Sequence, residues 1–569
     1  MKRKQTKYIF VVGGVMSGVG KGIASASISK IIQSRGIEVT ALKVDPYVNV
    51  DAGTMNPTEH GEVFVLDDGT ECDQDMGNYE RFLDRDLSRT NYMTTGSVYL
   101  SVIQKERNLE FGGRQVEVVP RIPLEIIERI NKAVAKAKAK VAVTEIGGTV
   151  GEYENILFLE AVRMLKIKNP QNVLLVLVSY VPALGAGGNE LKTKPTQHAV
   201  RSLNAVGLNP DIILARAHIS MDKKRKEKIE FMCSLEKGDV ISAPNVENIY
   251  KVPINFENDG LANRIFKKLG ISAKKRDMKD WRKMVKKMDN ATKVIKIGIV
   301  GKYFGTGEFV LEDSYISVIE SIKHASGVLG YKSEIQWVNS EQFEKNPTSL
   351  RELGEFNGII VPGGFGSRGI EGKISVIKYC RENRIPYLGL CYGMQLAVIE
   401  FARHVAKMKD ANTTEINPKT HYPVIDIMPE QKKNLKEKNY GATMRLGAYL
   451  ATLKKGSIAY SAYSQRRSLR ESPQGPSLII SERHRHRYEV NPEYIKKLEK
   501  SGLIFSGSSP DRRLMEIIEL PKSKHPFFLG TQFHPELKSR PLSPHPLFTT
   551  FIKACVGKKF VVYKRKKRK

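Results

Sequence analysis

A five-residue turn with a cysteine at its centre constrains the fold of this chain more than any other feature. The turn is Gly-Leu-Cys-Tyr-Gly at 389–393, between the apolar run 385–388 and the helix-like stretch 395–400. Glycines on both sides of a nucleophile allow a strained passage from strand to helix, which lifts the side chain clear of the sheet. The pattern predicts an α/β domain in which Cys391 stands at the carboxyl end of a strand.

Two residues far downstream are candidates for activating this cysteine. A free thiol has a pKa of about 8.5 and needs a helix N-terminus or a neighbouring imidazole to become thiolate at neutral pH. The turn supplies the first, and His534 can supply the second. If residues 532–536 run extended, Glu536 points to the same face as His534 and can orient its ring. The alternative reading is a buried structural cysteine and an unrelated surface turn.

A glycine-rich loop at 361–366 follows the strand-like segment 358–360. Consecutive glycines after a strand let backbone N–H groups converge on one point, as an oxyanion hole for acyl transfer requires. Together with the cysteine turn and the His–Pro–Glu segment, this loop resembles a class I (triad) glutamine amidotransferase domain, from about Lys293 to about Gly557. The resemblance implies that Cys391 attacks the side-chain amide of glutamine and releases ammonia, with His534 and Glu536 completing the catalytic triad.

The same resemblance implies a set of glutamine-binding residues: Gly364, Tyr392, Gly393, Met394, Gln395, Glu415 and Arg487, with Arg485 as the alternative to Arg487. Both arginines belong to the run 482–489, in which arginine and histidine alternate. That run can instead be read as a solvated basic strand.

The first half of the chain opens with a candidate phosphate-binding loop. A strand-like segment at 8–12 is followed by the glycine-rich stretch 13–22 and by a helix that Gly36 can terminate. Strand, glycine loop and helix together cradle phosphates. The spacing departs from the Walker A pattern, because the glycine before Lys21 is misplaced by one and Gly22 stands where Ser or Thr is expected. A plain helix-capping turn is the alternative.

Carboxylates follow the neighbouring strands. Lys43 and Asp45 end the next strand, Asp75 lies further on, and Glu145 comes just after another buried-looking strand. Open parallel sheets bind ligands at this edge, and Mg²⁺ is commonly held by one or two carboxylates together with nucleotide phosphates. Asp75 and Glu145 are therefore the predicted magnesium ligands, whereas the acidic pair at 67–68 is left unassigned.

Several long motifs, in this order, resemble the CTP synthase family over about residues 6 to 557. They are Val50–Met55, His60–Gly69, Glu145–Gly151 and Lys192–His198. The resemblance implies that ATP phosphorylates the 4-oxygen of the uracil ring of UTP and that ammonia displaces this phosphate to give CTP. It also implies an internal ammonia channel, a homotetramer, and GTP as an allosteric activator with Arg368 as a contact.

Carried over by resemblance, the nucleotide-binding residues fall into two sets. The ATP set is Gly18, Val19, Gly20, Lys21, Gly22, Ile23, Asp75, Pro244, Asn245 and Val246. The UTP/CTP set is Ser17, Glu152, Tyr153, Glu154, Lys192, Thr193, Lys194, Pro195, Thr196, Gln197 and Lys228. The chain departs from the pattern expected of the family at Thr58, Glu59, Ser97, Arg121 and Pro123, and at Glu152 and Tyr153. These departures bear on UTP affinity, CTP feedback and subunit contacts rather than on the reaction class.

Length and composition fit this organisation. A chain of 569 residues with 41% apolar residues suits two doubly wound α/β domains. We expect a P-loop-like synthetase (amidoligase) domain at 1–272, an exposed basic linker at 273–293, an amidotransferase domain at 294–557 and a disordered basic tail at 558–569. The five scattered cysteines favour neither a disulfide framework nor a zinc site. The sequence lacks a membrane-length apolar run and the apolar region of a secretory signal, which predicts a cytoplasmic protein.

The net charge of +31 leaves other functions open. Part of it suits an enzyme of polyanionic substrates, but the linker and tail also permit non-specific contact with nucleic acid. A nucleic-acid-binding protein is therefore one rival, although aromatic interleaving and a reading module are lacking. A synthetase that amidates a cofactor carboxylate is a second rival. A structural role in filaments is a third.

Overall fold

The computed structural model describes residues 5–185, 190–272, 278–301, 312–364, 368–437, 440–465 and 478–557. The side chains of Thr58 and Glu312 also lie outside this description. The chain divides into two compact units. Unit 1 comprises Met1–Ala52 and Cys72–Val285, and unit 2 comprises Gly53–Glu71 and Lys286–Lys569.

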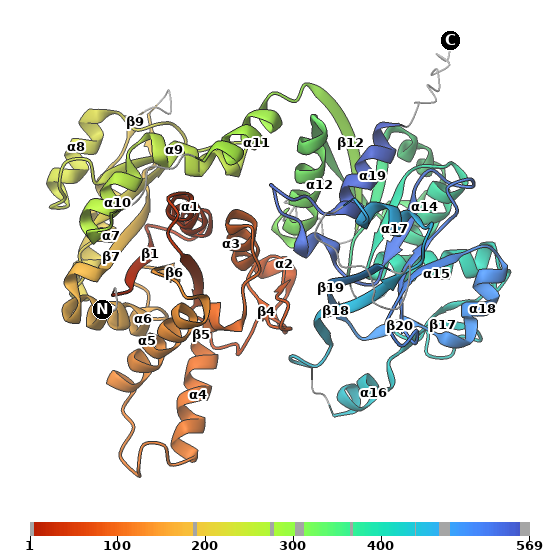
Figure 1. The fold of residues 1–569 in the computed structure, drawn as a ribbon, viewed down its shortest axis with the longest axis horizontal. Coiled ribbons are helices and arrows are strands. Elements are labelled where there is room, and N and C mark those ends of the chain that lie inside the picture. The colour runs from red at the N-terminus through yellow and green to blue at the C-terminus, as the bar shows by residue number, and fades with distance from the viewer. Residues whose placement is uncertain are drawn as a thin grey trace. The chain divides into compact units, whose positions relative to one another are not determined.

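Unit 1 is built on a seven-stranded sheet whose paired strands all run parallel (Figure 1). In spatial order the strands are β11 (Val240–Pro244), β10 (Ile212–Ala217), β7 (Val173–Tyr180), β1 (Lys7–Gly14), β6 (Val141–Thr149), β2 (Val39–Asp45) and β5 (Tyr92–Thr94). The helices are α1 (Lys21–Ser34), α3 (Asp75–Leu83), α4 (Thr95–Arg107), α5 (Val118–Ala137), α6 (Ile156–Lys168), α7 (Lys194–Ala205), α8 (Lys223–Met232), α9 (Val252–Asn258) and α10 (Leu261–Leu269). A small hairpin joins β8 (Ala183–Leu184) to β9 (Glu190–Leu191).

Helices cover both faces of this sheet. Phe10 and Val12 of β1 share a core with α5, α6 and α7. Ile9 and Val11, the alternate residues of the same strand, are equally buried and point to the opposite face, because side chains alternate along a strand. Helix α1 packs on β1, β2 and β6 with α3 and α9 beside it. The arrangement is doubly wound, as the sequence predicts.

Unit 2 contains a nine-stranded sheet that is only partly parallel (Figure 1). Its order is β13 (Tyr331–Asn339), β12 (Lys293–Gly301), β14 (Gly358–Val361), β15 (Tyr387–Leu390), β23 (Phe528–Thr531), β22 (Met515–Glu519), β21 (Ile504–Ser508), β18 (Arg445–Leu453) and β19 (Leu478–His486). The first five run parallel, and the last four extend the sheet antiparallel. The antiparallel extension is a feature that the buried-strand pattern did not predict.

The other elements of unit 2 flank this sheet. The helices are α12 (Ile316–Leu329), α13 (Glu341–Lys345), α14 (Ile370–Glu382), α15 (Tyr392–His404), α16 (Pro429–Lys436), α17 (Ile458–Tyr463), α18 (Pro492–Lys500) and α19 (Pro546–Val556). A three-stranded sheet contains β16 (Asn412–Thr413), β17 (Pro423–Ile427) and β20 (Tyr488–Val490). One core holds Ile359 with α14, α15 and α18, and the other holds Ile360 with α12, α17 and α19, so both faces are covered.

Residues 53–71 belong to unit 2 although they lie early in the sequence. They contain α2 (Pro57–His60) and β3 (Phe64–Val65), which pairs with β4 (Glu71–Cys72). The Ser314 hydroxyl donates to the carbonyl of Pro57 at 3.0 Å, and the Glu62 N–H donates to the carbonyl of Asp313 at 3.0 Å. These contacts attach the segment to the start of α12.

The predicted linker is helical where it is described. Helix α11 spans Lys279–Asp289, and Trp281 is 1% exposed. Its indole N–H donates to the carbonyl of Tyr250 at 2.8 Å, and its ring contacts Phe82. The division between the two units along the chain therefore falls inside this helix, after Val285. The lysines of the helix suggested an exposed linker, but aromatic packing within unit 1 holds its first half. Lys274, Lys275, Arg276 and the tail 558–569 lie outside the described residues, and the domain limits expected from the sequence stay predictions.

Across the described ranges, every helix is too short or too polar to cross a bilayer.

Candidate functional site

Cys391 occupies a strained strand-to-helix turn. It follows β15, caps the N-terminus of α15 and has φ 48° and ψ −100°. A non-glycine residue at positive φ costs about 1–3 kcal/mol, so the surrounding structure must hold it. The Cys391 N–H donates to the carbonyl of Thr531 at 2.6 Å. A side chain at Gly393 would put its Cβ 2.1 Å from the carbonyl of Val361, so only glycine fits there. The predicted elbow geometry is present.

His534 and Glu536 form a charged pair at the same edge of the sheet. The Nδ1 of His534 lies 2.7 Å from Oε1 of Glu536. β23, which precedes His534, runs parallel to β15, so both strands end at the same edge. The expected extended conformation is wrong. His534 precedes a 3₁₀ turn at Pro535–Lys538, and this turn brings the carboxylate back to the ring.

The environment of His534 favours the imidazolium. Burial is the largest effect and opposes the charge, but the charges of Glu536 and Cys391 raise the pKa of His534 to about 10. The Nε2 atom of His534 is buried without a hydrogen-bond partner in the described part of the chain. Cys391 and His534 both lie close to Gly363, whose Cβ, if present, would be 3.8 Å from Cys391 Cβ and 3.0 Å from His534 Cε1.

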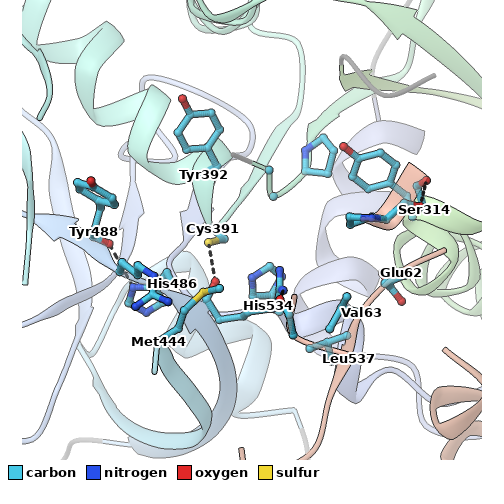
Figure 2. Close-up of a pocket in the computed structure, with 18 of the residues that line it drawn as sticks. Glu62, Val63, Ser314, Cys391, Tyr392, Met444, His486, Tyr488, His534 and Leu537 are labelled. Atoms are coloured by element: carbon cyan, nitrogen blue, oxygen red, sulfur yellow. Dashed lines mark hydrogen bonds between the residues drawn. The ribbon is translucent and has the colours of Figure 1, made fainter. Parts of the chain in front are cut away.

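A cavity of about 650 Å³ in unit 2 contains these three residues. Figure 2 shows Cys391 near its centre, with Glu62 and Val63 on one side and His486 and Tyr488 on the other. Five of the predicted glutamine-binding residues line it: Gly364, Tyr392, Gln395, Glu415 and Arg487. Gly393 and Met394 do not, since both are buried in the first turn of α15. Of the predicted oxyanion loop, Phe365 and Gly366 lie outside the described residues.

The two candidate arginines have different partners. Arg485 donates through Nε to Glu71 at 2.8 Å and through a second nitrogen to the carbonyl of Gly53 at 3.2 Å. Arg487 donates to neutral acceptors, the Gln431 side chain at 2.5 Å and the carbonyl of Tyr440 at 2.8 Å. Burial lowers the pKa of Arg487. An arginine held by neutral groups keeps its charge available for a carboxylate ligand.

The basic run 482–489 is not solvated. Arg483 and His484 are fully buried on β19, and His486 is 2% exposed. On the histidine face, His484 Nε2 lies 2.7 Å from Glu516, and Arg445 bridges Glu516 at 2.8 Å and Glu489 at 3.0 Å. His486 lines the cavity, and its Nε2 has no partner among the described residues. Sequence reasoning missed this network, although the Arg/His alternation has the period of two that places each type on one face of a strand.

The segment 53–63 forms a wall of the cavity that sequence reasoning also missed. Gly53, Thr54, Met55, Pro57, Glu62 and Val63 all line it. Nothing in the local pattern of these residues indicates a place beside a cysteine more than 300 positions later. Their only signal was membership of the long family motifs.

The glycine loop of unit 1 has the predicted strand, loop and helix. Gly20 adopts φ 86° at the N-terminus of α1, and the Lys21 ammonium donates to the carbonyl of Gly148 at 2.9 Å. A Cβ on Gly22 would lie 1.8 Å from Oδ1 of Asp75. The carboxylate thus takes the place of the Ser or Thr side chain that a Walker A loop has at this position.

Four carboxylates surround the ammonium of Lys43. It lies 2.7 Å from Asp75, 2.9 Å from Glu145, 3.5 Å from Asp73 and 3.6 Å from Asp45. Burial opposes the charge, but the carboxylates raise the pKa of Lys43 well above its usual range. Two cations, Lys43 and Lys21, face four acidic groups here, and burial raises the pKa of Asp73 to about 8. Within the described residues, no group of three or more His, Cys, Asp or Glu side chains is arranged to hold a metal by themselves. The donor set fits Mg²⁺ that is shared with nucleotide phosphates, since oxygen ligands and excess negative charge are both present.

The remaining nucleotide candidates are spread over unit 1. A cavity of about 110 Å³ is lined by Val19, Gly20, Ile23, Pro244 and Val246, together with Arg216 and apolar residues. Asn245 lies between two of these residues, and its N–H donates to the carbonyl of Ala217. Lys194 and Gln197 line another cavity of about 140 Å³.

The other UTP/CTP candidates line neither of these two cavities. Ser17, Glu154 and Lys228 are exposed. Pro195 is half-buried. Tyr153 is 92% exposed, and Glu152 accepts the N–H of Thr149 at 2.7 Å. Lys192 pairs with Glu190, and Thr196 is hydrogen-bonded to Ser179. Thr193 is buried at the start of α7.

The departures from the family pattern have mostly structural settings. Ser97 caps α4 together with Thr94 and accepts a hydrogen bond from Arg129 at 3.1 Å. Arg121 lies over the ring of Phe111, and Pro123 is in the first turns of α5. Glu59 is exposed. Arg368, the candidate GTP contact, is 69% exposed and pairs with Glu341 at 2.5 Å.

The fold and the two sites define a class of enzyme: a glutamine amidotransferase joined to a nucleotide-binding synthetase. Residues 7–271 match the family described as CTP synthase N-terminus, and residues 310–554 match Glutamine amidotransferase class-I. The chain belongs to the CTP synthase family. It has CTP synthase activity, the glutamine-dependent amination of UTP, and this family uses ATP and glutamine.

Two relatives that carry the name CTP synthase are similar over nearly the whole chain, and a solved structure is similar to about half of it. The CTP synthase of Methanococcoides burtonii is 49% identical over 553 residues, which cover 97% of this chain and 98% of the relative. The CTP synthase of Pyrococcus furiosus is 50% identical over 551 residues, covering 96% and 98%. The solved glutaminase domain of Trypanosoma brucei CTPS with bound acivicin is 36% identical, with a TM-score of 0.41, and covers 47% of this chain and 96% of that one.

Proposed function

We propose that Cys391, His534 and Glu536 release the ammonia that this enzyme uses. The Cys391 thiolate attacks the side-chain amide carbon of glutamine, and the imidazolium of His534 gives its proton to the departing ammonia. Water, deprotonated by the now neutral His534, then hydrolyses the thioester to glutamate. Glu536 holds the ring through the 2.7 Å contact to Nδ1. The observation that carries this proposal is that the strained Cys391 and the Glu536-bound His534 line the same cavity.

Polar groups around the same cavity suit the rest of the glutamine molecule. The Arg487 charge, held by neutral acceptors, suits the α-carboxylate, and Glu415 suits the α-ammonium group. Gln395 and Tyr392 border the side chain, and Gly364 offers a backbone N–H to the developing oxyanion. Gly393 and Met394 can contribute only through their backbone, because their side-chain positions are buried.

The synthetase roles in unit 1 rest on the glycine loop and on the carboxylates. We assign residues 18–23 to the phosphates of ATP and 244–246 to its adenine, with Lys21 as a point charge on the transferred phosphoryl group. Asp75 and Glu145 would hold Mg²⁺, which neutralises phosphate charge when bound. UTP is bound by Ser17, the segment 152–154, residues 192–197 and Lys228. The 4-oxygen of UTP is phosphorylated, and ammonia then displaces this phosphate.

Several wider properties belong to the same proposal. The high exposure of Tyr153 supports a UTP site completed by another subunit of a homotetramer. GTP acts as an activator, with Arg368 near the glycine loop as a contact. Five scattered, buried cysteines suit the reducing cytoplasm. Non-specific nucleic-acid contact is assigned to the basic tail, which carries eight Lys and Arg residues in 558–569.

The test is CTP formation from UTP, ATP and Mg²⁺ with glutamine or ammonia as the nitrogen donor. Cys391→Ala should lose the glutamine-dependent rate and keep the ammonia-dependent rate, whereas Lys21→Ala should lose both. Cys380→Ala, which removes a buried thiol of unit 2 outside the cavity, is the matched control and should keep both rates. A Cys391→Ala enzyme that still used glutamine would refute the nucleophile assignment.

A further inference from the structure

A second large cavity of unit 2 lies away from the proposed glutamine site. It has a volume of about 780 Å³. Arg384 and Pro386 precede β15, Pro526 and Phe527 precede β23, and Glu519 ends the antiparallel β22. All of these residues therefore lie at one edge of the sheet. Cys391 and His534 follow β15 and β23 at the other edge, roughly 13 Å away along four residues of strand.

Five cationic side chains line this cavity: Arg384, Lys454, Lys455, Lys522 and Lys553. They come from four separate parts of the chain: the loop before β15, the turn between β18 and α17, the loop after β22, and helix α19 (Figure 1). In the described residues, none of the five pairs with a carboxylate, and Lys553 donates only to the neutral Gln465 side chain at 3.3 Å. Arg381, one turn before Arg384, instead makes a 2.8 Å pair with Glu400.

One carboxylate lines the cavity, and its oxygens are already engaged. Glu519 is 2% exposed and accepts the N–H groups of Ile458 and Ala459 at 2.8 and 3.2 Å. These bonds hold the start of α17. Burial raises the pKa of Glu519, which further reduces the negative charge that it offers. Among the described residues that line the cavity, five cations therefore stand against one carboxylate, and Lys454 is the cation whose charge Glu519 feels.

All five cationic residues are exposed to solvent. Like charges gathered on a concave surface produce a positive potential and raise the local concentration of polyanions. Buried apolar side chains, Ile458, Ala462 and Phe527, form part of the same lining and leave room for a flat group beside the charges. We propose that this cavity binds a small ligand carrying a chain of phosphates, either a nucleoside triphosphate or free polyphosphate, at a site separate from both reaction centres.

The test is amide hydrogen exchange on the full chain with and without inorganic tripolyphosphate. Amide hydrogen exchange is measured segment by segment, so tripolyphosphate bound at the glycine loop of unit 1 does not change the exchange measured at this cavity. We expect protection of residues 456–463 and 522–527. The variant Lys454→Gln/Lys455→Gln/Lys522→Gln should need at least tenfold more tripolyphosphate for half-maximal protection. The matched control Lys332→Gln/Lys345→Gln/Lys419→Gln removes three exposed charges of unit 2 outside this cavity and should stay within twofold of wild type.

The other outcomes each decide the question. No protection of these segments at saturating tripolyphosphate, or equal half-saturation in the triple-lysine variant and wild type, would overturn the proposal. ATP protecting the segments at a lower concentration than tripolyphosphate would identify a nucleotide as the source, whereas equal potency would identify the phosphate chain alone. A third outcome is that only a 12-nucleotide RNA protects these segments. If deletion of residues 558–569 abolishes that protection and the triple-lysine variant retains it, the basic residues bind nucleic acid and the small-ligand site is refuted.

Discussion

The guanidinium of Arg485 donates through Nε to the carboxylate of Glu71 at 2.8 Å, although the two residues are 414 positions apart in the sequence. Glu71 is 1% exposed and Arg485 is 12% exposed at their side chains. The carbonyl of Arg485 lies 3.9 Å from Sγ of Cys391. This ion pair therefore links residues 53–71 to the backbone beside the nucleophile.

Replacement of Glu71 by Gln should impair glutamine use selectively. Breaking a buried ion pair from one side leaves an uncompensated charge and costs about 3 kcal/mol, part of which Arg485 recovers through its bond to the carbonyl of Gly53. We expect the KM for glutamine to rise about tenfold, while the ammonia-dependent rate of CTP formation changes less than twofold. An unchanged KM would show that the pair does not shape the glutamine site.

Asp67 and Asp68 should behave differently despite their adjacency. Asp67 contacts the buried Arg483 at 2.5 Å and Lys538 at 3.2 Å, and the Arg483 carbonyl accepts the N–H of His534 at 2.7 Å. Asp67→Asn should lower the melting temperature by several degrees and reduce glutamine hydrolysis. The exposed Asp68, changed to Asn, is the control and should leave both within error. Equal effects of the two changes would argue against a role for the Asp67–Arg483 pair.

Glutamine hydrolysis should continue to high pH and then fall. The pKa of His534 is about 10, above its ordinary value of about 6.5, so the imidazolium, the proposed proton donor to ammonia, is present below pH 10 and is lost as the pH rises through it. Glu536→Gln removes a charge that raises this pKa, and the alkaline limb of kcat/KM should move to lower pH. Profiles of both enzymes between pH 6 and 11 test this expectation. An alkaline limb at the same pH in both would rule out control by Glu536.

His525 should make unit 2 sensitive to acid. Burial lowers the pKa of His525 to about 4, and its Nδ1 accepts the N–H of Phe527 at 3.2 Å. In the unfolded chain this histidine binds a proton as the pH falls below about 6.5, whereas in the folded protein it stays neutral down to about pH 4. Its contribution to the free energy of unfolding, about 3 kcal/mol, is therefore complete above pH 6.5 and is lost as the pH falls to 4. His525→Gln cannot be charged in this range. The melting temperature of the variant should therefore drop a few degrees less between pH 7 and pH 4.5 than that of wild type; equal drops would contradict this account.

Magnesium should act through the carboxylates around Lys43. Asp75 and Glu145 are the proposed oxygen ligands, and Glu145 is 1% exposed. Mg²⁺ added with ATP should raise the melting temperature of wild type above the value with ATP alone, since binding to the folded state stabilises it. Glu145→Gln should lose this increment. Glu160→Gln, which changes a surface carboxylate paired with Arg163, should keep it. An increment that survived in Glu145→Gln would place the metal elsewhere.

Local patterns predicted the parts of the fold that are local in sequence. The cysteine elbow at 389–393 and the glycine loop at 13–22 each combine a strand, a turn and a helix within a short stretch, and both have the expected geometry. The antiparallel strands β18, β19, β21 and β22 were not distinguished from parallel ones. β22 is buried on both faces, which removes the alternation that marks an exposed face, whereas β18 alternates between buried and more exposed residues along part of its length, a signal that the sequence analysis did not use.

Contacts between distant segments could not be read from single-sequence patterns. Trp281 looked exposed among lysines, yet its ring packs on Phe82 and Tyr250, which are contributed by other parts of unit 1. His534 and Glu536 were expected to meet across an extended segment, but a 3₁₀ turn joins them. The wall formed by residues 53–63 depends on pairings such as Glu62 with Ser317, for which neither periodicity nor spacing gives a signal.

Unit 2 is made of two separate stretches of the chain, 53–71 and 286–569, so the order in which they are synthesised limits when the unit can fold. At about 5–20 residues per second, the ribosome needs on the order of a minute to proceed from Glu71 to Lys538. For most of this interval the nascent residues 53–71 lack Arg483 and Arg485, and until its end they lack Lys538; these are the cations that neutralise Asp67 and Glu71 in the folded protein. The acidic segment must stay unpaired and accessible until the last sixth of the chain has emerged, so the amidotransferase half becomes competent only after synthesis is nearly complete.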